Sequence, residues 1–330
     1  MEKVKDTTEK TTPKRRKVNF DYPWITAAVA LVALVVILAI VSPVFLTSSN
    51  IMSILRQASV YVIMALGMSF VLMTGGTDLS QGSLLALVGV VAAYIVQNVG
   101  SIPLAIVASI LVGAVVGFVN GTIVSRLKIP PFIATLAMMY LCRGLTLVIT
   151  RASPIVLTND SFKWIGTGSL LGLPVPVYIF LIAAAVGQFI LAYTATGRVV
   201  RAVGSNEEAA RLSGIKSSWN KCNVYIISGV MVGLAGVVYV ARLGAAQATA
   251  GQSYEMEAIA AAVLGGNSVM GGEGTIIGAV MGAIVVAIVR NAMVLLEIST
   301  YYQQIVTGAV ILIAVVIDIQ RKERAAKRVD

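Results

Sequence analysis

The chain has 330 residues, of which 58% are hydrophobic and 12% are charged, with a formal net charge of +10. Soluble domains carry roughly 25% charged residues, so this chain has too little polar surface to cover a water-soluble globule. It has no histidine, which excludes the usual imidazole base and the commonest metal ligand, and its two cysteines lie in different segments.

The chain begins with a basic segment and a first apolar block. Residues 1–19 are polar and contain seven Lys and Arg residues, so we expect a disordered cytoplasmic tail. The apolar block from Trp24 to Val44 is longer than the roughly 7–15 residue core of a cleaved signal peptide. We therefore expect it to be a retained membrane span.

Nine more apolar blocks follow, and they predict an all-α, polytopic membrane protein with about ten transmembrane helices. A helix needs roughly 20 apolar residues to cross about 30 Å of hydrocarbon. The blocks are apolar all round, whereas strands of a membrane barrel would alternate with every second residue. The block at 256–268 is short and ends in glycines, so of the ten it is the one that we expect to be a half-helix. The nine blocks are 53–74, 82–97, 102–125, 131–150, 174–193, 222–241, 256–268, 274–295 and 302–319.

The basic residues predict the orientation of these spans. With an even number of spans and a cytoplasmic N-terminus, 19 of the 25 Lys and Arg residues fall on the inner side. This bias is the one that the positive-inside rule predicts. We therefore expect a transmembrane domain at 20–320, a basic cytoplasmic tail at 321–330, and both termini in the cytoplasm.

The first interruption of the apolar pattern is Thr-Gly-Gly-Thr-Asp-Leu-Ser-Gln-Gly-Ser at 74–83. Each glycine weakens a helix by about 1 kcal/mol relative to alanine. Asp78 is placed to cap the next span by accepting a backbone N–H near Ser80 or Gln81. Two interpretations stay open: a tight cytoplasmic turn, or a helix break within the membrane that lines a polar pathway.

The largest inner loop, 197–221, predicts a short two-turn helix. Ser205 and Glu208 have the spacing of a capping box, and Gly214 can end the helix in the left-handed conformation. Such a short helix is unstable alone in water. It therefore packs on its own protein or the lipid surface, or it docks a soluble partner.

A third polar stretch, 247–268, combines amides, hydroxyls and Tyr254 on the outer side. It suits a neutral, hydroxyl-rich solute and equally suits an ordinary outer loop. The two halves of the chain, divided by the outer loop 151–174, also show a faint likeness. Gly75-Gly76 is followed by Gly82, and Gly265-Gly266 by Gly272 at the same spacing, which suggests an internal repeat.

Several motifs are missing from the sequence. It contains no Gly-x-x-x-x-Gly-Lys-Ser/Thr motif and no His/Cys/acid cluster, so we expect no nucleotide site, no metal, no cofactor and no hydrolytic centre. The ionisable residues within the spans are chiefly Arg143, Arg290 and Glu297. A proton- or sodium-coupled carrier usually has intramembrane carboxylates, so we expect the energy to come from another subunit.

Three segments give the chain a recognisable family. The Gly-Gly-Thr-Asp-Leu-Ser-Gln-Gly-Ser stretch at 75–83, the loop at 204–215 and Val-Leu-Gly-Gly-Asn-Ser-x-x-Gly-Gly-Glu-Gly at 263–274 resemble permease subunits of bacterial ABC sugar importers. The similar branch carries ribose and other monosaccharides, and the likeness extends over about residues 25–319. It implies a homodimer in the bacterial plasma membrane, two ATP-binding cassettes and an external sugar-binding protein.

The resemblance also implies roles for particular residues. It places Thr77 and Gln81 where the family usually has an aliphatic residue and a valine, which adds polarity near the pathway. A self-sufficient carrier or channel for a small neutral solute is the alternative function, and a membrane enzyme is a more remote one. We expect Asp78, Ser80, Asn120, Thr135 and Asn267 near the substrate pathway. We expect ATPase coupling by the loop residues Gly204, Asn206, Glu207, Ala209, Ala210, Ser213 and Gly214.

Overall fold

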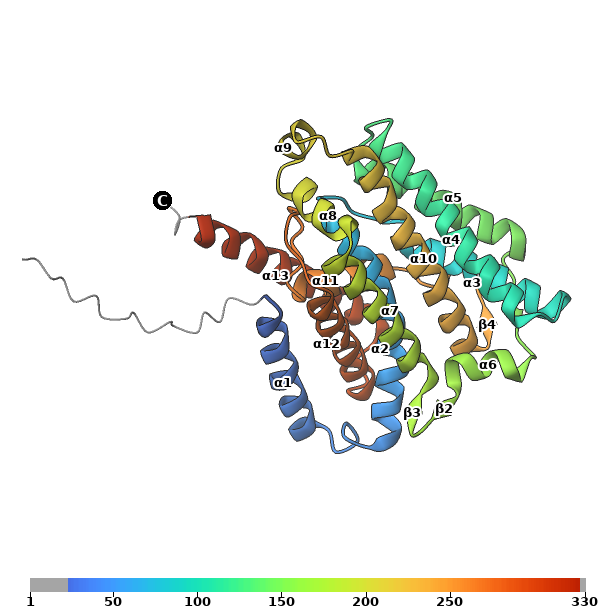
Figure 1. Cartoon of the computed structure of the whole chain (residues 1–330). Helices are drawn as coiled ribbons and strands as arrows, with labels where there is room; N and C mark the ends of the chain where they lie inside the picture. The colour runs from blue at the N-terminus through green and yellow to red at the C-terminus, as the bar shows by residue number, and fades with distance from the viewer. Residues whose placement is uncertain (1–22, 327–330) are drawn as a thin grey trace, which may run out of the picture.

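The structure is a computed structural model that describes residues 23–326, so the tail expected at 1–19 and the last four residues of the tail expected at 321–330 lie outside the described part. Figure 1 shows one helical bundle in which most of the long helices run side by side. In chain order the elements are α1 Pro23–Val41, α2 Ser48–Met73, α3 Gln81–Asn98, α4 Ile102–Ser125, α5 Pro131–Thr150, β1 Ile155–Val156, α6 Asp160–Thr167, β2 Ser169–Leu170, β3 Leu173–Pro174, α7 Val175–Tyr193, α8 Ala195–Ser205, α9 Glu207–Leu212, α10 Ser217–Leu243, β4 Ala245–Ala246, α11 Tyr254–Leu264, α12 Ile276–Leu295 and α13 Thr300–Ala326.

Seven helices of the described chain are long and apolar enough to cross a membrane: α2, α3, α4, α5, α7, α10 and α12. The prediction of a polytopic, all-α membrane protein is therefore confirmed. The apolar block at 256–268 is not a full span, because α11 has 11 residues and rises only about 16 Å. It is a half-helix, as its length and its terminal glycines indicate.

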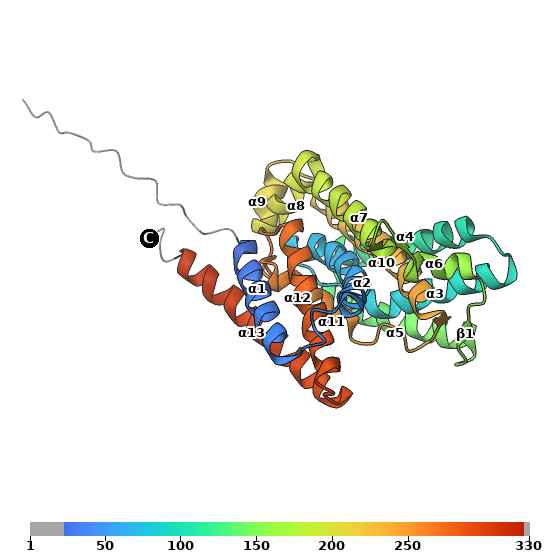
Figure 2. The ribbon, with the colours of Figure 1, turned by 90° about the horizontal axis from the view of Figure 1, so that it is seen from below.

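The core of the bundle is α2, and the outer helices expose apolar side chains. Figure 2 shows α2 near the middle, with α1 and α13 on one side and α4 and α5 on the other. In α2 every residue from Tyr61 to Met73 is buried, whereas Val115 in α4 is 59% exposed and Tyr140 in α5 is 68% exposed. A large apolar outer surface marks a lipid or protein interface, which fits a bundle surrounded by membrane.

Glycines let the backbones of α4 and α10 approach each other closely. A Cβ added to Gly113 would overlap the carbonyl oxygen of Gly229, and a Cβ added to Gly229 would overlap that of Gly113. Small residues at this spacing let two membrane helices pack backbone to backbone. These glycines therefore have a structural role at this pair.

The two ends of the bundle differ. Figure 1 shows α8 and α9 at one end, and α6 with the β2–β3 hairpin at the opposite end. The start of α1 and the end of α13 point toward the α8–α9 end. The hairpin pairs Ser169 with Pro174, and β1 pairs with β4, which ties the loop after α5 to the end of α10.

Candidate functional site

The first helix break carries a buried hydrogen-bond network centred on Asp78, which is 1% exposed. Its Oδ1 accepts the Ser80 hydroxyl at 2.6 Å and the Ser80 backbone N–H at 3.1 Å, and its Oδ2 accepts the Ser228 hydroxyl at 2.7 Å. No ion pair of the described chain involves Asp78. Neutral donors alone therefore solvate this carboxyl group, and the segment is a buried break, not an exposed turn.

Two amides extend the network and leave acceptors unused. Asn120 Nδ2 donates to the Ser80 hydroxyl at 2.9 Å, and Gln81 Nε2 donates to the Ser228 hydroxyl at 2.9 Å. The buried Oδ1 of Asn120 and Oε1 of Gln81 have no hydrogen-bond partner in the structure. A buried acceptor without a partner costs about 1–3 kcal/mol, so these two oxygens are the unpaired acceptors of the network.

Thr135 lies at the edge of this network. Its hydroxyl donates to the Pro131 carbonyl at 2.8 Å and lies 3.5 Å from the carbonyl of Thr77, to which Tyr225 also donates at 3.2 Å. The structure therefore brings four of the five predicted pathway residues to one break. Gln81 and Ser228 also belong to the network. The sequence analysis identified Gln81 as an unusual polar residue, whereas no sequence signal distinguished Ser228 within the apolar sequence of α10.

Asn267, the fifth predicted pathway residue, lies in a second and separate network. Its Nδ2 donates to the Ser69 hydroxyl and the Ala262 carbonyl, both at 3.0 Å, and its Oδ1 accepts the Thr275 N–H at 2.8 Å. These bonds tie the second break, between α11 and α12, to the side of α2. Asn267 therefore holds a loop and does not join the Asp78 network.

The two breaks begin with the same backbone ending. At the end of α2, Gly75 N–H donates to Leu72 O and Gly76 N–H to Val71 O. At the end of α11, Gly266 N–H donates to Val263 O and Asn267 N–H to Ala262 O. Both patterns are Schellman motifs, with Gly75 and Gly266 as the left-handed residues at φ +75° and +85°. The two helices thus end in the same motif, but its left-handed residue is the first glycine of the pair 75–76 and the second glycine of the pair 265–266.

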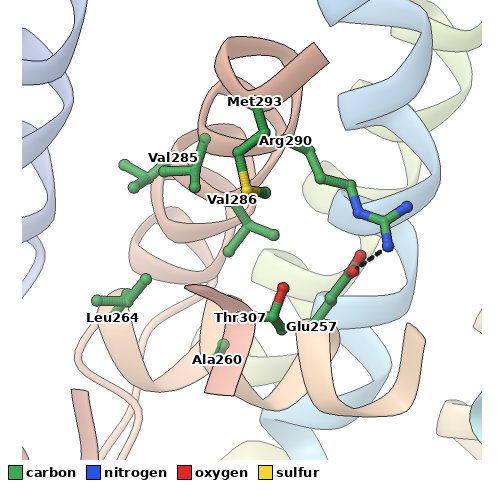
Figure 3. A pocket seen from close by; sticks show the side chains of 9 residues that line it. Glu257, Ala260, Leu264, Val285, Val286, Arg290, Met293 and Thr307 are labelled. Carbon is green, nitrogen blue, oxygen red and sulfur yellow. Dashed lines mark ion pairs between the residues drawn. The ribbon is translucent and has the colours of Figure 1, made fainter. Parts of the chain in front are cut away.

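A buried cluster of charges and aromatic rings was missed by the sequence analysis. Glu257 in α11 is 1% exposed and its Oε1 lies 2.7 Å from Arg290 Nη2 of α12. Figure 3 shows the two side chains pointing toward one another beside a cavity of about 20 Å³ between α11, α12 and α13. Arg290 also lies over the ring of Tyr254, 5.4 Å from its centroid.

This cluster corrects one argument drawn from the sequence. Asp78, Glu255 and Glu257 are all buried, while Glu297 is exposed in the turn after α12. The short set of ionisable residues expected within the spans therefore omitted three buried carboxylates, so that set is not an argument against an ion-coupled carrier. Glu255 and Glu257 were not singled out because they lie in the polar first turn of α11, next to an expected outer loop.

The stretch that leads into α11 is partly buried: Ala248, Ala250 and Gly251 are buried, whereas Gln247, Thr249 and Gln252 are exposed. Ala248 and Ala250 are each 6% exposed, and Arg143 of α5 donates from Nη1 to the carbonyls of both, at 2.9 Å for Ala250. Non-helical backbone at this depth needs such internal partners. Arg143 therefore supports a segment of consecutive turns before α11.

The loop at 197–221 forms two short helices, of which only one was expected. Asn206 caps α9, because its Oδ1 accepts the Ala209 N–H at 2.9 Å, while the Ser205 hydroxyl donates back to Arg201 O at the end of α8. The capping box predicted from Ser205 and Glu208 was therefore wrong by one residue. Glu208 instead pairs with Arg211 at 2.6 Å, and this hydrogen bond holds the pKa of the Glu208 carboxylate below its usual value.

Most of the predicted coupling residues are accessible. Asn206, Glu207, Ala209, Ser213 and Gly214 are exposed, whereas Ala210 is buried and Gly204 is partly buried. A groove of about 740 Å³ separates α9 from the turn between α4 and α5. Charged side chains of both signs line it, namely Lys128, Glu207, Glu208, Arg211 and Lys221.

Comparison with known proteins gives one family and a group of close relatives. The family model described as the permease component of the branched-chain amino acid transport system matches residues 50–315. The Ribose import permease protein RbsC of Escherichia coli K12 is 46% identical over 306 residues, which cover 91% of this chain and 95% of that protein. RbsC of Bacillus subtilis is 43% identical and covers 96% and 99% of the two chains.

A relative named for a different sugar is also similar. The D-allose transport system permease protein AlsC of Escherichia coli K12 is 40% identical over 275 residues, with 83% of this chain and 84% of that protein covered. No solved structure matches the chain.

Proposed function

The chain belongs to the family described as the permease component of the branched-chain amino acid transport system, and from this premise we propose that it is the membrane-spanning subunit of an ATP-driven importer that carries ribose into the cytoplasm. The observation that carries the proposal is the 43–46% identity to ribose import permeases over more than nine-tenths of the chain. It is a translocation subunit of a multi-pass inner membrane protein complex, and ATP hydrolysis belongs to a separate subunit.

The chemistry of the buried break supports a sugar over an amino acid. Asp78, Ser80, Asn120 and Gln81 supply hydroxyls, amides and one carboxyl group that no described cation pairs with. Neutral donors and acceptors suit a polyhydroxylated solute, whereas a zwitterion also needs a positive partner for its carboxylate. In this proposal Thr135 completes the pathway lining, and Asn267 keeps the second break in place.

The finer architecture is part of the same proposal. Ten crossings arise if α1, α13 and the turn segment 247–253 together with α11 are counted beside the seven long helices. The glycine spacing shared by residues 75–82 and 265–272 is the basis for proposing two related halves, and the basic α8–α9 end supports a cytoplasmic position for both termini. Two copies, two ATP-binding cassettes and an external sugar-binding protein complete the transporter.

Uptake by the reconstituted transporter tests this function. We expect vesicles that contain the permease, its ATPase and the sugar-binding protein to accumulate labelled ribose only when ATP is supplied. Collapse of proton and sodium gradients is expected to leave uptake unchanged. Uptake without the ATPase that follows an ion gradient would instead show a self-sufficient carrier, and competition by leucine but not by ribose would show an amino-acid permease.

The cap of α9 gives a test of the coupling role. Asn206→Ala removes the acceptor of the Ala209 N–H, and loss of such a cap costs about 0.5–2 kcal/mol of helix stability. Because α9 is only six residues long, we expect several-fold less ATPase to copurify with the permease. Asn220→Ala, at the start of α10, is the matched control and is expected to copurify normally. Equal recovery with both variants would refute the docking role of α9.

A further inference from the structure

Three backbone segments meet at Gly204, the penultimate residue of α8. The Gly272 N–H, in the second break, donates to the Met73 carbonyl at the end of α2 at 2.9 Å. A Cβ on Gly204 would overlap both that carbonyl oxygen and that amide nitrogen. The backbone of α8 therefore rests directly on the hydrogen bond that joins the two breaks.

Neighbouring glycines bring the backbones of the three segments close together. A Cβ on Gly271 would lie 2.8 Å from Gly204 O and 2.9 Å from Gly75 N, and one on Gly272 would lie 2.6 Å from the Ser205 hydroxyl oxygen and 3.2 Å from Ser205 Cα. Gly271 and Gly272 also have φ of +85° and +84°, a conformation that side chains rarely adopt. We call this contact of residues 73–75, 204–205 and 271–272 the glycine junction.

Backbone contacts of this kind transmit displacement with little loss. Side chains in a packed contact can change rotamer and absorb a shift, whereas touching peptide groups have no such freedom. Asn206 alone separates α8 from α9, and the Asn206 N–H donates to Ala202 O of α8 at 3.1 Å. A movement of α9 therefore reaches α8 without a flexible linker.

We propose that Gly204 is the positioning residue through which movement of α9 shifts both helix breaks together. The inference rests on the proposed function, because it takes α9 as the element that the ATPase moves. It adds that the Asp78 break and the Asn267 break respond as one unit, through a contact that excludes any Cβ. A purely packing role for Gly204 would affect assembly but would leave the ratio of ATP hydrolysed to sugar transported unchanged.

The test uses the complete reconstituted transporter with Gly204→Ala and, as control, Gly144→Ala in α5, where an added Cβ meets nothing within 4 Å. We expect Gly204→Ala to assemble with the ATPase but to transport at least tenfold less ribose per ATP hydrolysed. Gly144→Ala is expected to match the unmodified protein. A normal ratio of sugar to ATP in an assembled Gly204→Ala transporter would overturn the proposal.

Hydrogen exchange on the unmodified transporter provides a second test that needs no variant. On ATP binding we expect peptides at 73–76 and 271–276 to change protection together with those at 204–212. A change at 204–212 alone would overturn the glycine junction, even if Gly204→Ala fails to assemble. Failure of the unmodified permease to bind any ATPase would instead refute the proposed function.

Discussion

Replacing Arg290 with methionine is expected to destabilise the folded protein by about 3–5 kcal/mol, the typical cost of removing one partner from a buried ion pair. Glu257 would remain buried in α11 with its nearest cation removed and with an Oε2 that already lacks a hydrogen-bond partner. The ring of Tyr254 would also lose the guanidinium that lies over it. Thermal unfolding of the purified protein in detergent measures the effect.

The double variant Glu257→Gln/Arg290→Met separates the ion pair from simple packing. Removal of both charges is often nearly neutral, because neither ion is left uncompensated. We therefore expect the double variant to unfold at a higher temperature than Arg290→Met alone. A double variant that is less stable than either single variant would mean that the two side chains stabilise the bundle independently.

Replacing Asp78 with leucine is expected to abolish ribose transport and to lower stability markedly. The change leaves the Ser80 N–H, the Ser80 hydroxyl and the Ser228 hydroxyl without their acceptor, and each unpaired buried group costs about 1–3 kcal/mol. Uptake by reconstituted vesicles and thermal unfolding are the two measurements.

The variant Asp78→Asn separates the structural role of Asp78 in the helix break from its proposed role in the substrate pathway. Asparagine retains one carbonyl acceptor for Ser80 and can donate to the Ser228 hydroxyl, so the break is expected to keep its shape and the protein its stability. Asp160→Asn is the matched control, since Asp160 lies on α6 with a side chain that is 90% exposed. Full transport by a stable Asp78→Leu variant would remove Asp78 from the proposed pathway.

Features that depend on local sequence could be predicted. Hydropathy depends only on neighbouring residues, so the apolar blocks gave the long helices and the short block gave α11. The bond from the Ser80 N–H to Asp78 follows from their spacing, although Asp78 is not the predicted cap, because α3 begins at Gln81 and Ser80 is its N-cap. Both breaks contain adjacent glycines, which weaken a helix wherever they occur.

Features that depend on distant contacts could not be predicted. Ser228 reaches Asp78 across 150 residues of chain, and Asn267 reaches Ser69 across 198. The burial of Glu257 depends on Arg290, and single-sequence hydropathy counts both as polar. The prediction of the residue that caps α9 failed for another reason. Ser205 and Asn206 are both favourable N-cap residues, and Asn206 is the cap because Ser205 still belongs to α8.

The support that Arg143 gives to the segment before α11 has a consequence for biosynthesis. The backbone at 248–250 is not helical, so it cannot leave the translocation channel into hydrocarbon with its carbonyls unsatisfied. The Arg143 guanidinium, which donates hydrogen bonds to these carbonyls, precedes Ala248 by 105 residues in the chain. The ribosome therefore completes α5 before it makes the segment. The hydrogen-bond donor for this non-helical backbone is therefore already made when residues 248–250 emerge, so these residues can fold against α5 instead of against lipid.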